Sequence, residues 1–487
     1  MVFAEMKSGG TKIEWKRQDL LFAIVCAAEG AAAFCLSWII SEMHPTWASA
    51  VLIISGLFNY MLSVKKFCTM FDVRGVFAAV WLCSIGLSCL RFNEYQLPWS
   101  SVTWVCLIAA YIAFELGFFF ELNDSENVSE KGKKSLKFAK WQVTRVSIGE
   151  KALFTWLSIF FAGLMICLGI EAAVCGFIPI FSSSMDAYVN FMVFPFHYFT
   201  VSAPLFFPIS YYYLKKFRPS GIKKTLMILF NVACLLVPFL IVSRQLYVLS
   251  IIVDMFIIGL MEHRKEASVL CLAIFLFVFG WFTIGKFRNQ SNEYVEQVFT
   301  EIQYADADYL QKKTTSMTEQ GKGYASNCDI ELPDSVFPVY MYVAFNFDNF
   351  NYLVDNIEEF SNGRQAMMPL LVYTRLSDSI LKAADSRGYV LLATFNTYPF
   401  ICSYYRDFGI TGVALGALLT GVFCAWVMKK SRNGDIVWRT VEALTKYSVL
   451  FCFFGNFFLN VTMWFYVFLL IFIWHIMNLS IQKIRRI

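Results

Sequence analysis

Twelve apolar stretches, each about long enough to cross a bilayer as a helix, recur along this 487-residue chain. A bilayer core about 30 Å thick needs roughly 20 apolar helical residues per crossing. Hydrophobic residues make up 58% of the chain and charged residues 16%, which leaves too little polar surface for a soluble fold. We therefore predict an all-α integral membrane protein with about 12 transmembrane helices. The predicted spans are 20–40, 47–64, 75–91, 101–120, 152–171, 191–213, 225–243, 246–261, 267–284, 407–428, 442–459 and 462–479.

Helices are expected in preference to a barrel because a lipid-exposed segment must satisfy its own backbone hydrogen bonds. The apolar stretches also lack the alternation of polar and apolar residues that marks a transmembrane barrel. No small-residue cleavage site follows the first stretch, so we interpret it as a retained span and not as a signal peptide.

Lysine and arginine orient the predicted spans. The connections at 41–46, 92–100 and 172–190 hold almost none, and the alternate connections hold many. By the positive-inside rule, the basic connections and both termini are expected in the cytoplasm. The chain then divides into nine helices in 1–284, an extracytoplasmic loop with amphipathic helices in 285–400, and three helices with a basic tail in 401–487. The basic positions lie at 16–17, 65–74, 131–151, 215–218, 264–265, 429–432 and 483–486.

The predicted outer loop is too long for an ordinary connection, and such loops are usually functional or disordered. Its dense aromatic residues argue against disorder, and 335–360 is predicted to form an amphipathic helix at the membrane surface. Within that helix, Asn346, Asp348 and Asn349 would line a polar face able to bind sugar hydroxyls. A surface helix with a merely solvated side is the alternative.

Arg244 is the arginine that the positive-inside rule explains least. It stands between two apolar stretches, at a turn predicted to face outward. A cation at membrane depth costs a few kcal/mol and usually marks a substrate path or a partner. The alternative is that Arg244 extends to the interface or pairs with a carboxylate from another helix.

Further cations persist on the predicted outer side. Lys286 and Arg288 stand where a span emerges, and Arg364 and Arg375 lie further along the loop. The segment 285–406 is acidic overall, with ten Lys and Arg against fifteen Asp and Glu, so these cations are not part of a basic surface. Arginine offers a planar fork of donors that suits phosphate oxygens. Loop ion pairs are the alternative for each of them.

A polar and aromatic cluster marks the point where the loop re-enters the membrane. It combines aromatic faces, phenolic donors, a cation and a carboxylate, although an interfacial aromatic belt with a helix-capping aspartate has the same composition. Its members are Asn396, Tyr398, Tyr404, Tyr405, Arg406 and Asp407.

His197 is a second candidate base on the predicted outer side, with a packed interfacial histidine as the alternative. The chain has only four histidines, and no carboxylate–histidine cluster is visible in the sequence. We therefore expect no metal and no cofactor.

The runs Asn396–Tyr398 and Tyr404–Val413 resemble the re-entry motif of bacterial oligosaccharide repeat-unit polymerases, the Wzy-type O-antigen and capsular polysaccharide polymerases. Three further features agree with this resemblance: Ser243–Gln245, the Gly176–Pro179 entry to an outer connection, and a large outer loop before the last three spans. The likeness in pattern and layout extends over roughly 150–430, and only 396–413 is specific.

The resemblance implies a GT-C-like, metal-independent glycosyltransferase of the bacterial inner membrane with its active site on the periplasmic side. Its substrates would be undecaprenyl-diphosphate-linked glycans, with the growing chain transferred to the non-reducing end of a new repeat unit. Arg244 and Arg288 would stabilise the departing diphosphate. Asp407, or alternatively His197, would accept the proton of the attacking hydroxyl. The remaining site residues would position sugar or phosphate: Lys286, Asn346, Asp348, Asn349, Arg364, Arg375, Asn396, Tyr398, Tyr404, Tyr405 and Arg406.

Two other functions remain open. A ligase that moves a finished glycan to another acceptor would share the donor-side arginines. A flippase or other transporter should place ionisable residues within its spans, and Glu29, Glu115 and Asp254 are candidates for that role. The expected partners are membrane lipid, the lipid-linked glycan, a flippase and a chain-length regulator protein, with no nucleic acid.

Overall fold

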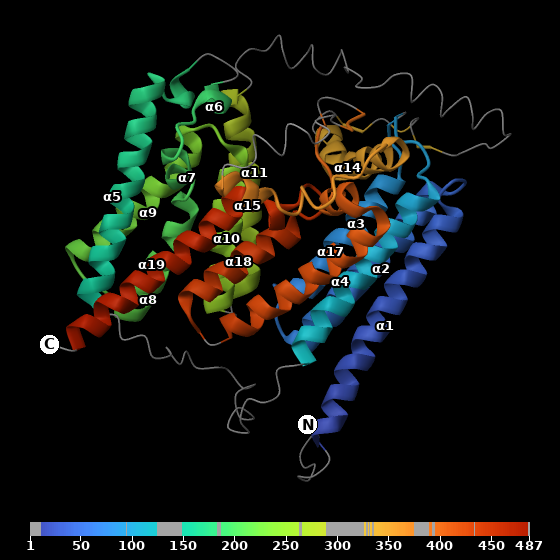
Figure 1. Cartoon of the computed structure of the whole chain (residues 1–487), viewed down its shortest axis with the longest axis horizontal. Coiled ribbons are helices and arrows are strands. Elements are labelled where there is room, and N and C mark those ends of the chain that lie inside the picture. Colours follow the sequence, from blue (N-terminus) through green and yellow to red (C-terminus); the bar gives the residue numbers. More distant parts are fainter. Residues whose placement is uncertain are drawn as a thin grey trace.

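The computed structural model is helical in all of its regular elements within the residues it describes (Figure 1). These are residues 11–93, 95–123, 149–182, 187–262, 265–288, 326–327, 330, 332–333, 336–374, 389–391, 395–432 and 434–485, and side chains are described for most of them. The start of α1 and the end of α19 lie toward one side of the molecule, whereas α6 and α14 lie toward the opposite side.

One group of helices shares a continuous apolar core, which we call the first half. Its first two hairpins pack against each other, and the long helix α17 runs along α4. The members are α1 (Thr11–Ile40), α2 (Pro45–Phe67), α3 (Val73–Cys89), α4 (Ser101–Asn123), α14 (Phe337–Asn356) and α17 (Ile401–Ser431).

A second apolar core defines the second half, built mainly from the middle of the chain. Its helices are α5 (Glu150–Cys175), α8 (Phe206–Phe217), α9 (Ile222–Leu240), α10 (Arg244–Met261), α11 (Glu266–Arg288), α18 (Ile436–Leu450) and α19 (Val461–Arg485). Short elements lie in the connections: η2 (Pro179–Phe181), α6 (Ala187–Asn190), α7 (Phe196–Thr200), η3 (Ala203–Leu205), α15 (Met368–Tyr373) and η5 (Phe457–Leu459).

The two halves are joined through α18, which packs against α10 in the second half and against α17 and α3 in the first. The segment 451–460, which follows the C-terminal end of α18, also links the halves through hydrogen bonds. Phe400 donates its N–H to the Cys452 carbonyl over 2.7 Å, and the Asn456 amide donates to the Phe400 carbonyl over 3.0 Å. The start of α17 is thereby fixed to the entry of α19.

Within the described residues, seven helices are long and apolar enough to cross a membrane, and three shorter apolar helices accompany them. The class of α-helical, multi-pass membrane protein is thus supported, while twelve spans stay a prediction. Two of the predicted spans are not continuous helices. The stretch 191–213 is broken into α7, η3 and α8, with prolines at its breaks. In the stretch 442–459, α18 ends at Leu450, and turns and then η5 follow.

Glycines allow a close contact between α4 and α17. A Cβ on Gly117 of α4 would lie 2.1 Å from the Leu418 carbonyl oxygen, and one on Gly421 of α17 would lie 2.3 Å from the Phe114 carbonyl oxygen. Small residues let helix backbones approach each other in this way, which is a common means of association in membranes.

Candidate functional site

The polar residues predicted on α14 are buried, and their partners belong to the protein. Asn346, Asp348 and Asn349 are each 3% exposed or less. Asp348 accepts hydrogen bonds from Gln96 Nε2 at 2.9 Å and from Trp99 Nε1 at 2.8 Å. A helix within the predicted 335–360 is found as α14, but its polar face is buried in the fold and not open to solvent. The structure corrects that expectation because each polar group is used to fix a neighbouring loop.

Asn346 and Asn349 hold the segment that precedes α17. The Asn349 amide donates to the Phe395 carbonyl over 2.6 Å and to the Thr397 carbonyl over 3.0 Å, and its oxygen accepts from the Leu391 N–H over 3.1 Å. Asn346 donates to the Tyr342 carbonyl over 2.7 Å and accepts from the Thr397 hydroxyl. These bonds position the re-entry segment against α14.

The helix α17 is broken at Phe408 and Gly409, where the backbone leaves helical geometry. Gly409 has φ +61°, and a Cβ there would meet the Phe360 ring at 3.1 Å. The break frees two carbonyls from the helix: Arg406 O accepts from Ser361 N over 2.7 Å, and Asp407 O accepts from Asn362 N over 3.2 Å. The turn that begins at Ser361 therefore docks on the break.

Asp407 fastens the same turn with its side chain. It is 1% exposed, and it accepts from Gln365 N at 3.0 Å, Ala366 N at 2.8 Å and the Ser361 hydroxyl at 2.5 Å. A general base must reach the proton that it removes. Because both oxygens already accept protein hydrogen bonds inside the fold, the structure favours an anchoring role for Asp407.

The other members of the re-entry cluster divide into packed and accessible residues. Tyr405 is buried, with its ring edge-on to Phe350, and the Tyr404 hydroxyl lies 3.1 Å from the Thr420 hydroxyl. Asn396 is exposed and Tyr398 is half-buried. Burial raises the pKa of Tyr398, which keeps its phenol neutral as a hydrogen-bonding group.

Arg406 and Arg364 are two described cations near the re-entry segment of the first half. Arg406 is half-buried, with its guanidinium over the Tyr389 ring at 5.7 Å. Arg364 is half-buried in the turn docked on Asp407, and its N–H donates to the Ser361 carbonyl over 3.2 Å. The side chains of Lys286 and Arg288, in the last turn of α11, and the whole of Arg375 lie outside the described residues.

Arg244 opens α10 in the second half. Ser243 precedes it as the helix cap, and its hydroxyl accepts from Leu246 N over 3.2 Å. The predicted spans 225–243 and 246–261 correspond to α9 and α10, which form a tight hairpin with only residues 241–243 between them. Arg244 is half-buried, and the first turns of α10 share the apolar cluster of Val201 and Ala203. Arg244 therefore belongs to the same half as His197, on α7.

His197 is held by a buried carboxylate that sequence reasoning missed. Its Nδ1 lies 2.9 Å from Glu171 Oε1, which also accepts from Val193 N at 3.2 Å. Glu171 is fully buried, whereas the His197 side chain keeps 24% of its surface exposed. The signal available in the sequence was an acidic residue at the end of an apolar stretch, but 26 residues separate it from its partner.

Local structure explains how these two residues meet. Glu171 stands in the last turns of α5, and the helix ends at Gly176, whose φ of +76° suits glycine. The Gly176 N–H donates to the Ala172 carbonyl over 3.0 Å, and the chain then turns back. Because α7 packs against α5, Val193 and His197 come to lie over Glu171.

The structure thus divides the predicted site residues between the halves. His197 and Arg244 belong to the second half, and the re-entry cluster belongs to the first. Tyr373 of α15 reaches across, since its hydroxyl donates to the Val461 carbonyl over 2.7 Å and its ring lies edge-on to Phe468.

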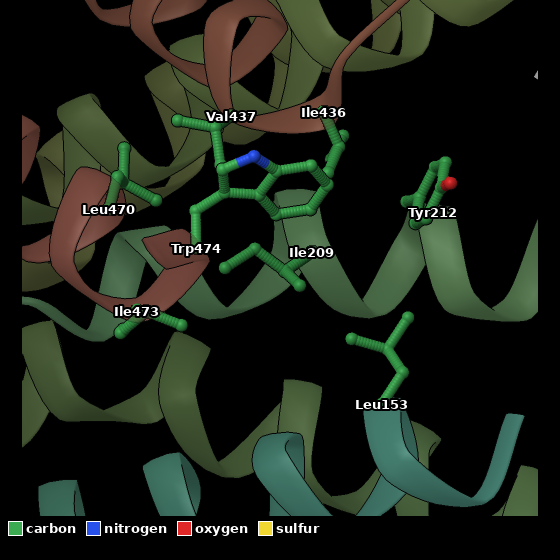
Figure 2. Close-up of a pocket in the computed structure, with 8 residues that line it drawn as sticks. All are labelled: Leu153, Ile209, Tyr212, Ile436, Val437, Leu470, Ile473 and Trp474. Carbon is green, nitrogen blue, oxygen red and sulfur yellow. The ribbon is translucent and has the colours of Figure 1, made fainter. Parts of the chain in front are cut away.

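An apolar crevice between α5, α8, α18 and α19 lies apart from these groups (Figure 2). Figure 2 shows the Trp474 ring beside Ile436 and Val437, and the hydroxyl of Tyr212, another lining residue, accepts from Lys216 over 3.0 Å. The crevice begins at Leu153, which precedes Glu171 by 18 residues or about 27 Å of helix. Its lining is apolar. The lining residues are Leu153, Ile209, Tyr212, Ile436, Val437, Leu470, Ile473 and Trp474.

Comparison with known proteins found no match among protein-family models, curated proteins or solved structures.

Proposed function

We propose that this protein polymerises lipid-diphosphate-linked oligosaccharide repeat units at the outer face of the bacterial inner membrane. The proposal rests on the resemblance of 396–413 to repeat-unit polymerases and on a multi-pass helical fold that suits a lipid-linked substrate. The observation that carries it is the placement of a cation and an oriented imidazole in one half of the molecule, with Arg244 at the start of α10 and His197 against Glu171.

These residue types match the proposed chemistry. A hydroxyl oxygen of the acceptor sugar attacks the anomeric carbon of the donor chain, and the bond from that carbon to the diphosphate oxygen breaks. The electron pair leaves with the diphosphate, and its negative charge is best stabilised by preorganised cations in a water-poor site. Arg244 is the described candidate for that role, and Arg288 remains the second. The hydroxyl proton needs a base, and His197 is more accessible than Asp407.

Deletion of the gene in its own host tests the proposal. We expect the long-chain ladder of the surface glycan to disappear while single repeat units still reach the surface. Lipid-linked glycans and surface glycans are separated on gels to measure this. Unchanged ladders would exclude the polymerase function.

Substitution of Arg244 tests its place in the mechanism. We expect Arg244→Ala to abolish the ladder in a complemented deletion strain and Arg244→Lys to restore it in part, because lysine keeps the charge but not the fork of donors. Arg218→Ala, at the end of α8, is the matched control and should complement fully. Wild-type ladders from Arg244→Ala at normal protein level would remove Arg244 from the mechanism.

A flippase for the same lipid-linked glycan is the second candidate, and a buried ion network favours it. Arg74 Nε lies 2.8 Å from Glu115 Oε2, with both side chains fully buried in the first half. The Arg74 Nη2 also donates to Asn59 Oδ1 over 2.8 Å, and the Asn59 amide donates to Glu29. Ionisable groups inside a helical membrane bundle are typical of transporters. Deletion of a flippase would leave repeat units on the inner leaflet with no surface glycan, which separates the two functions.

A further inference from the structure

We infer that Glu171 is a positioning residue that fixes the tautomer of His197, so that His197 Nε2 accepts the proton of the attacking sugar hydroxyl. This inference rests on the proposed function and deepens it. It assigns a role to a carboxylate that the sequence alone does not connect with the site.

The geometry determines which ring nitrogen carries the proton. Glu171 Oε1 accepts from the Val193 N–H, and as an acceptor it pairs with a protonated nitrogen, so Nδ1, at 2.9 Å from the same oxygen, is the protonated nitrogen of the neutral ring. Nε2 then holds the free electron pair. The Val193 N–H, 3.2 Å from the same oxygen, holds the carboxylate in place from the segment that precedes α7.

Burial separates the roles of the two side chains. Glu171 is fully enclosed and cannot touch a substrate, whereas about a quarter of the His197 side chain is open. Two titratable side chains lie nearby: Cys167, one turn before Glu171 on α5, and Tyr198, next to His197. At the ordinary pKa of a thiol or a phenol, both are uncharged at neutral pH. Within the described residues around α7, the Glu171 carboxylate is thus the group that orients the imidazole.

The proposed step needs no reactant other than the donor chain and the acceptor sugar. The hydroxyl proton passes to His197 Nε2 while the oxygen forms its bond to the anomeric carbon and the diphosphate leaves. The ring becomes an imidazolium, and the Glu171 carboxylate stabilises that charge through Nδ1–H. The ring returns its proton to water or to the departing diphosphate before the next cycle.

The tautomer can be measured independently of any activity. The full chain, labelled with 15N-histidine in lipid nanodiscs, gives signals from only four histidines. At pH 8 we expect the His197 signals of a ring protonated at Nδ1 and unprotonated at Nε2. Glu171→Gln should shift the ring toward the other tautomer, because an amide can also donate to Nδ1. The matched variant Glu359→Gln, at an exposed position after α14, should leave the spectrum unchanged.

Activity measurements use the purified full chain in vesicles with lipid-linked repeat units. General acid–base catalysis contributes roughly 10²–10⁴-fold, so we expect His197→Gln to lower kcat by that order. Glu171→Gln should lower kcat by roughly tenfold or more, with KM little changed, and move the acidic limb of the pH–rate profile to lower pH. His44→Gln, at the cap of α2, is the histidine control and should match wild type.

The outcomes separate the two proposals. If wild type polymerises and both His197→Gln and Glu171→Gln match it, the inference fails and the polymerase function stands. If wild type shows the expected tautomer but makes no polymer from any tested lipid-linked glycan, the polymerase function fails and the Glu171–His197 geometry stands. A loss of activity in Glu171→Gln with an unshifted pH profile and an unchanged His197 tautomer would show a structural role and overturn the inference.

Discussion

Asp407 and Glu171 are buried carboxylates, one in each half of the molecule, and each accepts hydrogen bonds from backbone N–H groups. They differ in what else they bind. Asp407 uses both oxygens on the turn at 361–366, whereas Glu171 also holds an imidazole that is partly open. A residue that looks reactive in the sequence can thus be an anchor in the fold, and an unremarked residue can orient a reactive one.

Removal of the Asp407 side chain should loosen the docked turn. We expect Asp407→Ala to lower the free energy of unfolding by about 2–3 kcal/mol, because buried backbone donors lose a charged acceptor. Glu359→Ala, an exposed carboxylate nearby in sequence, should be neutral. Thermal unfolding in detergent and protease sensitivity near residue 362 check this. Equal stability of the two variants would contradict the anchoring role.

Glu262, just after α10, is expected to make the stability of the fold depend on pH. Burial alone would raise its pKa, but hydrogen bonds from Lys215, Lys265 and Tyr211 outweigh it and lower the pKa from 4.5 to about 2. The stabilisation is therefore complete above pH 4.5 and is lost as the pH falls toward 2. We expect Glu262→Gln to cost about 1 kcal/mol at pH 7, since the lysines are partly solvent-screened.

The difference in unfolding midpoint between wild type and Glu262→Gln checks this when it is measured from pH 7 downward. It should shrink below pH 4.5. A difference that is constant with pH would show that the carboxylate charge is not responsible.

At the scale of elements, α17 shows how one interruption serves two purposes. Its first part, before Gly409, receives the turn at 361–366 and is tied to 451–460, while its second part packs along α4. The break supplies free carbonyls for the turn, and glycines on α4 and α17 bring the two helices close together. Asp407 and Gly409 of the re-entry motif thus serve to position the turn at 361–366 against α17.

The packing of α4 against α17 should be sensitive to a single methyl group. Alanine favours helix over glycine by about 1 kcal/mol, yet we expect Gly117→Ala to destabilise the protein by about 1–3 kcal/mol, because its Cβ would lie 2.1 Å from a backbone oxygen. Gly163→Ala on α5, where nothing lies within 4 Å, is the matched control and should be neutral or stabilising. Thermal unfolding of both variants in one detergent checks this prediction.

At the scale of the whole molecule, two helical halves meet at α18 and at the 451–460 segment. The described site residues divide between them, with Tyr373 of α15 reaching from 361–374 to α19. The side of the membrane on which these residues lie is decisive for the proposed function.

Cysteine labelling tests the predicted sidedness. In a background without Cys328 and without Cys35, Cys68 and Cys271, the exposed cysteines among the described residues, we expect a cysteine at Asn362 to react with a membrane-impermeant reagent in spheroplasts. A cysteine at Lys216, at the end of α8, should react only after permeabilisation. The opposite pattern would invert the topology and exclude an outer-face site at these residues.

Much of the fold follows from the sequence, because hydropathy and helix length are local properties. Seven long apolar helices overlap predicted spans, and a helix at 337–356 lies within the predicted 335–360. The breaks in 191–213 and 442–459 were missed, since an apolar stretch that contains turns has the same hydropathy as a continuous helix. The site was predicted less well, because the polar pattern on α14 looks the same whether its partners are loops or sugars.

The sequence by itself determined that this chain is a helical membrane protein and which segment resembles a polymerase motif. It also showed that the positive-inside rule does not account for Arg244 and the later cations on the predicted outer side. Only the tertiary structure decided that Asn346, Asp348, Asn349 and Asp407 hold loops and that Glu171 holds His197. The physical reason is that a hydrogen bond needs two groups about 3 Å apart. Residues separated by 26 or more positions come within that distance only through helix packing, which the local pattern does not encode.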